Sequence, residues 1–314
     1  MSGVLNLTIP FFALVFLGYF FRSRGFLDGG ASSVLTRFAF FVALPPFMFI
    51  KVSAANAMDI LNWGFVWRYE LSTLIIFVGG ALLAMVLFRM PKAEAGILGL
   101  NCAYPNFGYI GVPLSIMAFG DMAALPVALI LLADHVVLLG LTAIFVSNSE
   151  KGRLQAMLAV LMTMARNPLL ISVFAGIGFS SFSGWSGFDL PVMLDRFLVM
   201  LAGAAAPVAL FALGATLFGQ KIRAAIPELT LITLFKLILH PVLVAILFLA
   251  IPDQPLMWIQ VAILCACLPV ASNVFVLADQ YGFYAGRTAT AILVTTILAS
   301  VTVPLTLYIL FRLA

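Results

Sequence analysis

The sequence predicts an all-α integral membrane protein whose ten transmembrane helices form two inverted five-helix repeats. Three observations lead to this fold class: the composition, the number of long apolar segments, and two interruptions at matching places. Of the 314 residues, 64% are hydrophobic and only 9% are charged, whereas a soluble domain carries about 25% charged residues. This composition is typical of a chain that passes repeatedly through a bilayer.

The apolar segments give the number of spans, because a transmembrane helix needs about 20 predominantly apolar residues. The apolar stretch Leu154–Ala165 is short and ends at Arg166-Asn167-Pro168. We therefore expect it to form a membrane-surface helix rather than an eleventh span. Spans are expected at 4–21, 33–53, 65–88, 95–118, 123–147, 167–183, 190–218, 228–250, 256–279 and 288–310.

The net charge of +4 indicates membrane topology rather than a nucleic-acid surface, because the basic residues are scattered over short loops. Cytoplasmic loops carry an excess of Lys and Arg. The sequence therefore predicts that the loops after odd-numbered spans are cytoplasmic and that both termini lie outside. The cations in these loops are Arg22, Arg24, Arg89, Lys92, Lys151, Arg153, Arg166, Lys221, Arg223 and Arg287.

An internal repeat determines how the two halves are oriented. Ile9–Phe21 resembles Asn167–Phe179, and Leu35–Phe38 resembles Leu194–Phe197. Each copy contains five spans, an odd number, so the second copy enters the membrane from the opposite side. Inverted repeats of this kind are found in many secondary transporters. We expect the first repeat at 1–149 and the second at 150–314.

Two of the apolar segments contain residues that interrupt a helix. Asn101–Asp121 contains Pro105 and Asn106, and Cys265–Gly282 contains Pro269. Proline removes a backbone donor and clashes with the preceding turn. In hydrocarbon, the freed backbone groups are tolerated only where protein or a wet cavity surrounds them. Two interrupted helices at corresponding places in two halves are the best sequence indication of a transporter's binding site.

The interrupted segments have the chemistry of a site for a small organic anion. The N-terminal ends of half-helices offer unpaired amides and a partial positive charge, which suit a carboxylate. Amide and hydroxyl side chains can donate to it without the cost of a buried cation, and glycines let a ligand approach the backbone. Alternatively, these residues only satisfy the broken backbone. The candidate substrate-binding residues are Pro105, Asn106, Gly108, Gly111, Pro269, Ser272 and Asn273.

Ionisable residues within the spans form a second candidate group. Such residues cost roughly 2.5–3.5 kcal/mol each on insertion scales and therefore suggest function. Asp134 and His135 lie near the middle of the fifth span, and Lys236 and His240 lie one turn apart in the eighth. Asp134 could pair with Lys236, and either histidine could take part in proton coupling, since histidine titrates near neutral pH. The alternative is a static pair that holds two helices together.

The remaining polar residues indicate no cofactor or metal. Lys51 and Glu70 flank the loop between the second and third spans, where we expect an outer polar cluster or side chains that extend to the interface. The three cysteines, Cys102, Cys265 and Cys267, all lie in apolar segments. They fit neither a disulfide framework nor a metal site.

The sequence lacks the motifs of competing functional classes. It contains neither the phosphate-binding GxxxxGK[ST] loop of an ATP-driven pump nor the HExxH motif of a zinc protease. Gly184-Trp185-Ser186-Gly187 resembles the serine turn of an intramembrane protease, but it lies outside the apolar segments and is interpreted as a turn. An anion channel remains an alternative, because interrupted helices also line pores.

The two interruptions also carry a family resemblance. Pro105-Asn106, Gly111, Pro113-Leu114 and Phe119-Gly120 resemble the fourth-span signature of the auxin efflux carrier family. That family includes plant PIN-type carriers and bacterial permeases for malate and malonate. The family's ninth and tenth spans are similar to a later run: Leu268-Pro269, Phe275–Ala278, Gln280–Gly282 and Pro304–Thr306.

This resemblance implies a fold similar to that of the bile-acid/sodium symporters. Spans 1, 2, 6 and 7 would form a scaffold, expected to be homodimeric. Spans 3–5 and 8–10 would form an elevator-type transport domain whose broken helices 4 and 9 cross.

The resemblance also bears on the substrate. The link between the halves, about Ser147–Arg166, is short, unlike the long loop of the plant carriers. It favours a protein of the bacterial cytoplasmic membrane and argues against auxin itself as the substrate. The expected substrates are carboxylates such as malate or malonate, or auxin-like acids. Protons, sodium or the membrane potential could drive transport, and a sodium-coupled symporter of the bile-acid type is an alternative.

Overall fold

The computed structural model shows an all-helical chain. It describes residues 2–55, 62–146, 155, 158, 161–162, 164–220, 226–251 and 253–312. Within these residues every regular element is a helix, and the only bridge is an isolated one between Pro105 and Val270. The expected surface helix Leu154–Ala165 lies largely outside the described residues. The loop cations Lys151, Arg153, Lys221 and Arg223 also lie outside them.

Eight helical stretches of the described chain are long and apolar enough to cross a membrane, whereas the sequence predicted ten spans. The other two predicted spans are divided, because α5 (Lys92–Ala103) and α14 (Leu256–Ala266) end in mid-segment. A helix of this length is about 18 Å long, much less than a hydrocarbon core of about 30 Å. The eight stretches are Gly3–Ser23, Gly29–Ser53, Trp63–Leu87, Asp121–Val146, Pro168–Ser186, Val192–Leu217, Ile226–Leu249 and Ala285–Leu310.

The helices divide into two compact units, of which unit 1 comprises residues 1–62, 108–129 and 165–219. Its helices are α1 (Ser2–Ser23), α2 (Gly29–Phe38), α3 (Leu44–Ser53), α6 (Val112–Phe119), α9 (Pro168–Ser186), α10 (Val192–Gly203) and α11 (Ala205–Leu217). In this unit α1 packs against α11, and α3 packs against α9. A Cβ atom on Gly214 would lie 1.8 Å from the carbonyl oxygen of Val15. Only glycine therefore lets α1 and α11 approach this closely.

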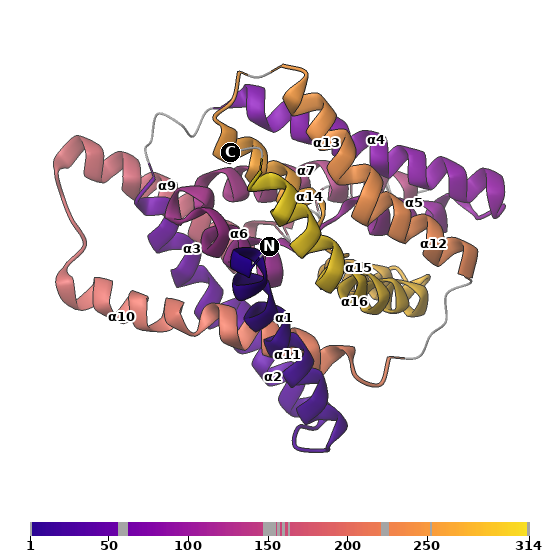
Figure 1. Ribbon diagram of the computed structural model, residues 1–314, viewed down its shortest axis with the longest axis horizontal. Helices are drawn as coiled ribbons and strands as arrows, with labels where there is room; N and C mark the ends of the chain where they lie inside the picture. The colour runs from indigo at the N-terminus through magenta and orange to yellow at the C-terminus, as the bar shows by residue number, and fades with distance from the viewer. Residues whose placement is uncertain are drawn as a thin grey trace. The chain divides into compact units, whose positions relative to one another are not determined.

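Unit 2 comprises residues 63–107, 130–164 and 220–314. Its helices are α4 (Trp63–Leu87), α5, most of α7 (Ala124–Val146), α12 (Ile226–Leu234), α13 (His240–Leu249), α14, α15 (Ser272–Gln280) and α16 (Ala285–Leu310). Within it, α4 runs beside α5 and α13, and α5 runs beside α12 (Figure 1). A Cβ atom on Gly99 would lie 2.6 Å from the carbonyl oxygen of Phe77, so α4 and α5 are also in close backbone contact.

Three π-helical segments precede prolines: η1 (Ala39–Ala43), η3 (Phe107–Gly111) and η5 (Phe235–Leu239). The following helices α3, α6 and α13 each have proline at their first or second residue, namely Pro45, Pro113 and Pro241. The ring of a proline clashes with the carbonyl group four residues back, and in each case that carbonyl belongs to the π segment. The wider turn accommodates the proline without ending the helix.

Candidate functional site

The two interruptions meet inside unit 2. The chain is extended at Tyr104 after α5 and at Ala271 before α15. The amide of Asn106 donates to the carbonyl oxygen of Pro269 at 2.9 Å, and the amide of Ala271 donates to the carbonyl oxygen of Tyr104 at 3.2 Å. Pro105 and Val270 form the antiparallel bridge between these bonds. The amides of Asn106 and Ala271, which leave the helical pattern at the breaks, are thus satisfied by the opposite segment, as the membrane interior requires.

The sequence-predicted binding residues lie at or beside this paired break, but in different environments. Pro105, Asn106 and Pro269 are buried, with Asn106 only 2% exposed. Ser272 is half-buried and Asn273 is exposed in the first turn of α15. The N-terminus of α15 has no side-chain cap, so it offers the partial positive charge that a carboxylate needs.

The two predicted glycines follow Asn106 in the chain. Gly108 and Gly111 belong to η3, and Gly108 is half-buried. A Cβ atom on Gly108 would meet only the side chain of Leu169, at the ordinary contact distance of 3.8 Å. Packing within unit 1 therefore does not require glycine at position 108.

Polar side chains on neighbouring helices support the break. Asn101 donates to the carbonyl oxygen of Ile97 at 2.8 Å and to the hydroxyl of Thr288 on α16 at 3.0 Å. The hydroxyl of Thr295, also on α16, accepts from the amide of Val270 at 3.2 Å. These bonds tie both halves of the break to α16, which is a continuous helix and therefore a rigid support.

The predicted intramembrane residues separate into two groups. The Nζ of Lys236 donates to the carbonyl oxygen of Ala266 at 2.9 Å and lies 3.1 Å from Nδ1 of His240. The Nε2 of His240 lies 3.1 Å from the hydroxyl of Thr73 on α4. Lys236 therefore caps the last carbonyl group of α14, at the negative end of that helix.

The other group centres on His135. The hydroxyl of Tyr104 lies 2.9 Å from Nε2 of His135, and Nδ1 of His135 lies 2.8 Å from the carbonyl oxygen of Leu131. His135 thus contacts the break through Tyr104, whereas His240 contacts Lys236. The sequence could not distinguish these roles, because the two histidines occur in equally apolar surroundings.

Glu70 was expected near the outer loop, and the structure places it elsewhere. It lies on α4, and its carboxyl group faces that of Asp134 within unit 2. Lys51, its expected neighbour, instead donates to Asp121 at 2.6 Å within unit 1. Glu70 and Thr73 are one helical turn apart, so both reach the buried polar cluster. We refer to Glu70, Thr73, Asp134, Lys236 and His240 as the buried cluster.

Comparison with known proteins then assigns the chain to a family. Residues 4–307 match the model of a family described as membrane transport protein. The chain belongs to the membrane transport protein family. This is the auxin efflux carrier family that the motifs around Pro105 and Pro269 predicted.

Several relatives of the chain span nearly its whole length. It is 35% identical to the "Putative malonate transporter" of Rhizobium meliloti (strain 1021), over 98% of this chain and 96% of the relative. An uncharacterized transporter of Escherichia coli (strain K12) is 26% identical over 96% of both chains. An uncharacterized transporter of Methanothermobacter thermautotrophicus is 24% identical over 96% of this chain and 97% of the relative.

As a member of the membrane transport protein family, the chain is an integral membrane transporter and not an enzyme. The serine of Gly184-Trp185-Ser186-Gly187 fits this conclusion. Ser186 is the last residue of α9 and donates to the carbonyl oxygen of Phe182 at 2.7 Å, and Gly187 adopts the left-handed conformation that ends the helix. The motif is therefore a helix terminus.

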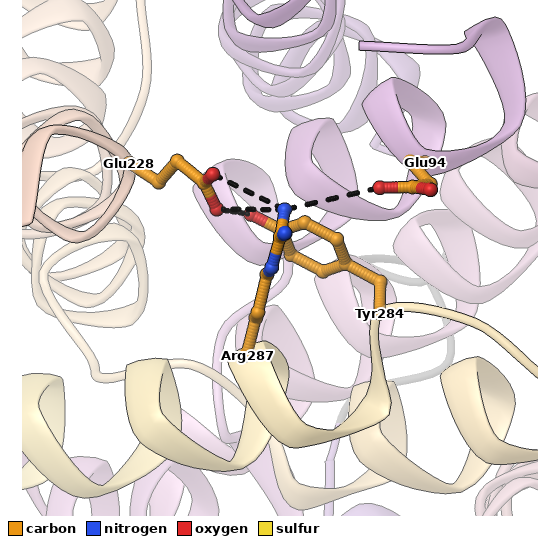
Figure 2. A network of polar contacts seen from close by, with 4 residues as sticks. All are labelled: Glu94, Glu228, Tyr284 and Arg287. Carbon is orange, nitrogen blue, oxygen red and sulfur yellow. Dashed lines mark hydrogen bonds and ion pairs between the residues drawn. The ribbon is translucent and has the colours of Figure 1, made fainter. Parts of the chain in front are cut away.

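A network of ion pairs joins the N-terminal ends of three unit 2 helices in this family member (Figure 2). Nη1 of Arg287 on α16 lies 3.1 Å from Oε1 of Glu228 on α12 and 3.8 Å from Oε2 of Glu94 on α5. The hydroxyl of Tyr284 donates to Glu228 at 2.9 Å. Burial and the neighbouring Glu228 raise the pKa of Tyr284 above its usual range, so the phenol stays protonated and remains a donor. We call these four residues the Arg287 network.

An ion pair between Arg68 and Asp253, which we call the Arg68 clamp, joins α4 to the loop before α14. Arg68 on α4 forms hydrogen bonds with both carboxylate oxygens of Asp253 and with the carbonyl oxygen of Ile251. Its hydrogen bond to Asp253 lowers the pKa of that carboxyl group. Sequence reasoning treated Arg287 as a topology signal and singled out neither contact, since the partners of Arg68 and Arg287 lie more than 50 residues away in the chain.

Proposed function

We propose that this protein is a secondary transporter that moves small organic anions by alternating access, and that malonate is the first substrate to test. The observation that carries the proposal is the paired break: two interrupted helices meet within one unit and leave the uncapped N-terminus of α15 beside buried Asn106. The name of the Rhizobium meliloti relative supports malonate as the probe.

The recognition chemistry follows from the residues at the break. A carboxylate at this position accepts hydrogen bonds from Asn106, Ser272 and Asn273 and lies at the positive end of α15. Pro105 and Pro269 keep the two segments extended, because neither can donate a helical hydrogen bond. Gly108 and Gly111 carry no side chain at two positions of the π-helical turn that follows Asn106. Amide donors suit an anion that must also be released, since they add no buried charge.

The architecture we propose is ten spans in two inverted repeats, at 1–149 and 150–314. The packing in unit 1 supports it: α1, the first helix of one repeat, packs on α11 from the second predicted span of the other, while α9 packs on α3 in the reciprocal way. Two repeats related by a two-fold axis produce such reciprocal contacts.

The division of the helices into two compact units supports alternating access. Unit 1 contains predicted spans 1, 2, 6 and 7 with residues 108–129. Unit 2 contains spans 3, 8, 9 and 10, the first half of span 4 and most of span 5. We propose that unit 1 is the scaffold and that unit 2 is the transport domain, which carries the anion in an elevator-type movement.

Topology and assembly are part of the same proposal. We place both termini outside a bacterial cytoplasmic membrane and assign homodimer formation to the scaffold helices of unit 1. In α10 no residue is buried, and Met200 is 79% exposed. A cysteine at Met200 should cross-link two copies in native membranes, because the natural cysteines are buried. Absence of cross-linking along the whole exposed face of α10 would contradict this dimer.

Counterflow in proteoliposomes tests the transport proposal. Vesicles loaded with unlabelled malonate should take up labelled malonate transiently above equilibrium, because a carrier exchanges one for the other. An anion channel shows no such trans-stimulation. A thermal-shift screen of mono- and dicarboxylates across pH and sodium concentration identifies a better substrate where malonate fails, since a ligand that binds the folded state stabilises it.

A further inference from the structure

We propose that Glu70 and Asp134 share one proton, and that this proton is taken up and released together with the transported anion. The coupling of the proton to the anion rests on the proposed function, since it makes the transporter a proton–anion symporter. The sharing of the proton depends only on the two carboxyl groups and their surroundings.

The two carboxyl groups form a buried pair inside unit 2. Asp134 on α7 is fully buried, and Glu70 on α4 faces it with both carboxylate oxygens shielded from solvent. Asp134 lies within hydrogen-bonding reach of Glu70 and of the Thr73 hydroxyl. Two negative charges in contact in a buried site would repel each other and lose their hydration, so a pair of this kind holds a proton between its members.

The charge balance of the buried cluster requires the same proton. Lys236 is fully buried, and its ammonium form contributes one positive charge. Asp134 and Glu70 together with one proton contribute one negative charge, so the cluster is neutral. Without the shared proton it would carry a net charge of −1 in a medium where an unbalanced charge is costly.

The other titratable groups around the pair do not supply a second charge near neutral pH. Thiols and phenols ionise above neutral pH even in water. Neutral His240 accepts from the Lys236 ammonium at Nδ1, so its Nε2–H donates to the Thr73 hydroxyl. The groups that face the cluster are Tyr69 and Thr73 from α4, Cys102 from α5, Tyr104 beyond α5, Lys236 from η5, His240 from α13, and Cys265 and Cys267 at the end of α14.

A direct contact connects this charge to the break. Lys236 caps the carbonyl group of Ala266, the last residue of α14 before the interruption. Loss of the shared proton therefore adds negative charge close to the proposed anion site, and the anion is repelled. By reciprocity, a bound anion favours the protonated pair to the same extent. Proton and anion consequently bind together and leave together.

Transport measurements with malonate and a pH gradient test this coupling. With the membrane potential clamped at zero, an acidic exterior should drive accumulation of labelled malonate by about tenfold per unit of pH gradient, and an internal pH dye should report proton entry. Glu70→Gln and Asp134→Asn should retain counterflow and lose the pH-driven accumulation. Asp189→Asn makes the same chemical change at an exposed loop position and should behave like the natural protein.

The outcomes separate the two proposals. Counterflow without any response to the pH gradient in the natural protein overturns proton coupling and leaves the transport proposal in place. Absence of counterflow with every carboxylate of the screen overturns the transport proposal.

The shared proton has its own readout in the infrared spectrum of the purified protein. The carbonyl stretch of a protonated carboxylic acid should be present at neutral pH and be lost in both Glu70→Gln and Asp134→Asn, but not in Asp189→Asn. Its absence from the natural protein overturns the pair. Either single variant suffices if the other fails to fold.

Discussion

The Arg287 network and the buried cluster use the same kinds of residues in opposite ways. In the Arg287 network each charged group has a partner of opposite charge, and Tyr284 adds a hydrogen bond to Glu228 (Figure 2). In the buried cluster, the carboxyl group of Glu70 faces another carboxyl group, that of Asp134. Like charges in contact are costly in a buried site. We therefore propose that the Arg287 network holds helices in place, whereas the buried cluster has a role in transport.

The double variant of the buried cluster should give the largest effect. Glu70→Gln with Asp134→Asn leaves Lys236 without a counter-charge, and the free energy of unfolding should fall by about 3–5 kcal/mol. Each single variant should change it by less than about 1 kcal/mol, because the remaining carboxylate balances Lys236. Detergent-solution unfolding of the four proteins measures this non-additivity. Additive effects would mean that the two carboxyl groups act independently.

Arg287→Ala should destabilise the protein by about 2–3 kcal/mol, because it leaves Glu228 buried and without its cation. Arg287→Lys keeps the positive charge and loses the second hydrogen bond to Glu228, so its loss should be about 1 kcal/mol. The same unfolding measurement applies. Malonate counterflow per folded molecule should be unchanged in Arg287→Lys; a selective loss of transport would assign the Arg287 network a role in function.

Removal of the Tyr284 hydroxyl should have a smaller effect. Tyr284→Phe deletes one hydrogen bond to Glu228, which retains Arg287 as a partner, and should cost about 1 kcal/mol. Tyr308→Phe on the same helix is a matched control. Equal stability of both variants would show that the phenol contributes nothing to the Arg287 network.

The smallest expected effect is the acid dependence of the Arg68 clamp. Because Arg68 lowers the pKa of Asp253, the ion pair contributes stability above the unfolded value of about 3.9. That contribution is lost as the pH falls through the lowered pKa of the folded protein. Melting temperatures between pH 6 and 3 should therefore decline less steeply in Asp253→Asn. Parallel curves would contradict a contribution from this pair.

What the sequence could predict depends on whether a feature arises from neighbouring residues or from residues far apart in the chain. Pro105 and Pro269 interrupt their helices for local reasons, so the breaks and most span limits follow from the chain itself. The partners at the break, such as Thr288 and Thr295, lie on a distant helix and gave no signal beyond polar residues in an apolar span. Glu70 was misplaced because a carboxyl group near a predicted loop fits either an interface or an interior.

The pairing of Asp134 with Lys236 shows the same limit. Sequence reasoning placed both residues within spans and expected a direct ion pair. The structure places them in one cluster, where Lys236 forms hydrogen bonds with the carbonyl oxygen of Ala266 and with His240. Which atoms meet depends on the rotation of each helix, and π segments such as η5 change that rotation in a way that local composition does not reveal.

The most direct test of the account is malonate binding to Asn106→Ala measured by isothermal titration calorimetry, with Asn6→Ala as a control at an exposed position of α1. If the paired break binds the carboxylate through Asn106, the affinity should fall at least about tenfold, to the point of no detectable binding. The folded protein and its melting temperature without ligand should stay close to those of the control. Unchanged malonate affinity in Asn106→Ala would contradict the assignment of the anion site to the break.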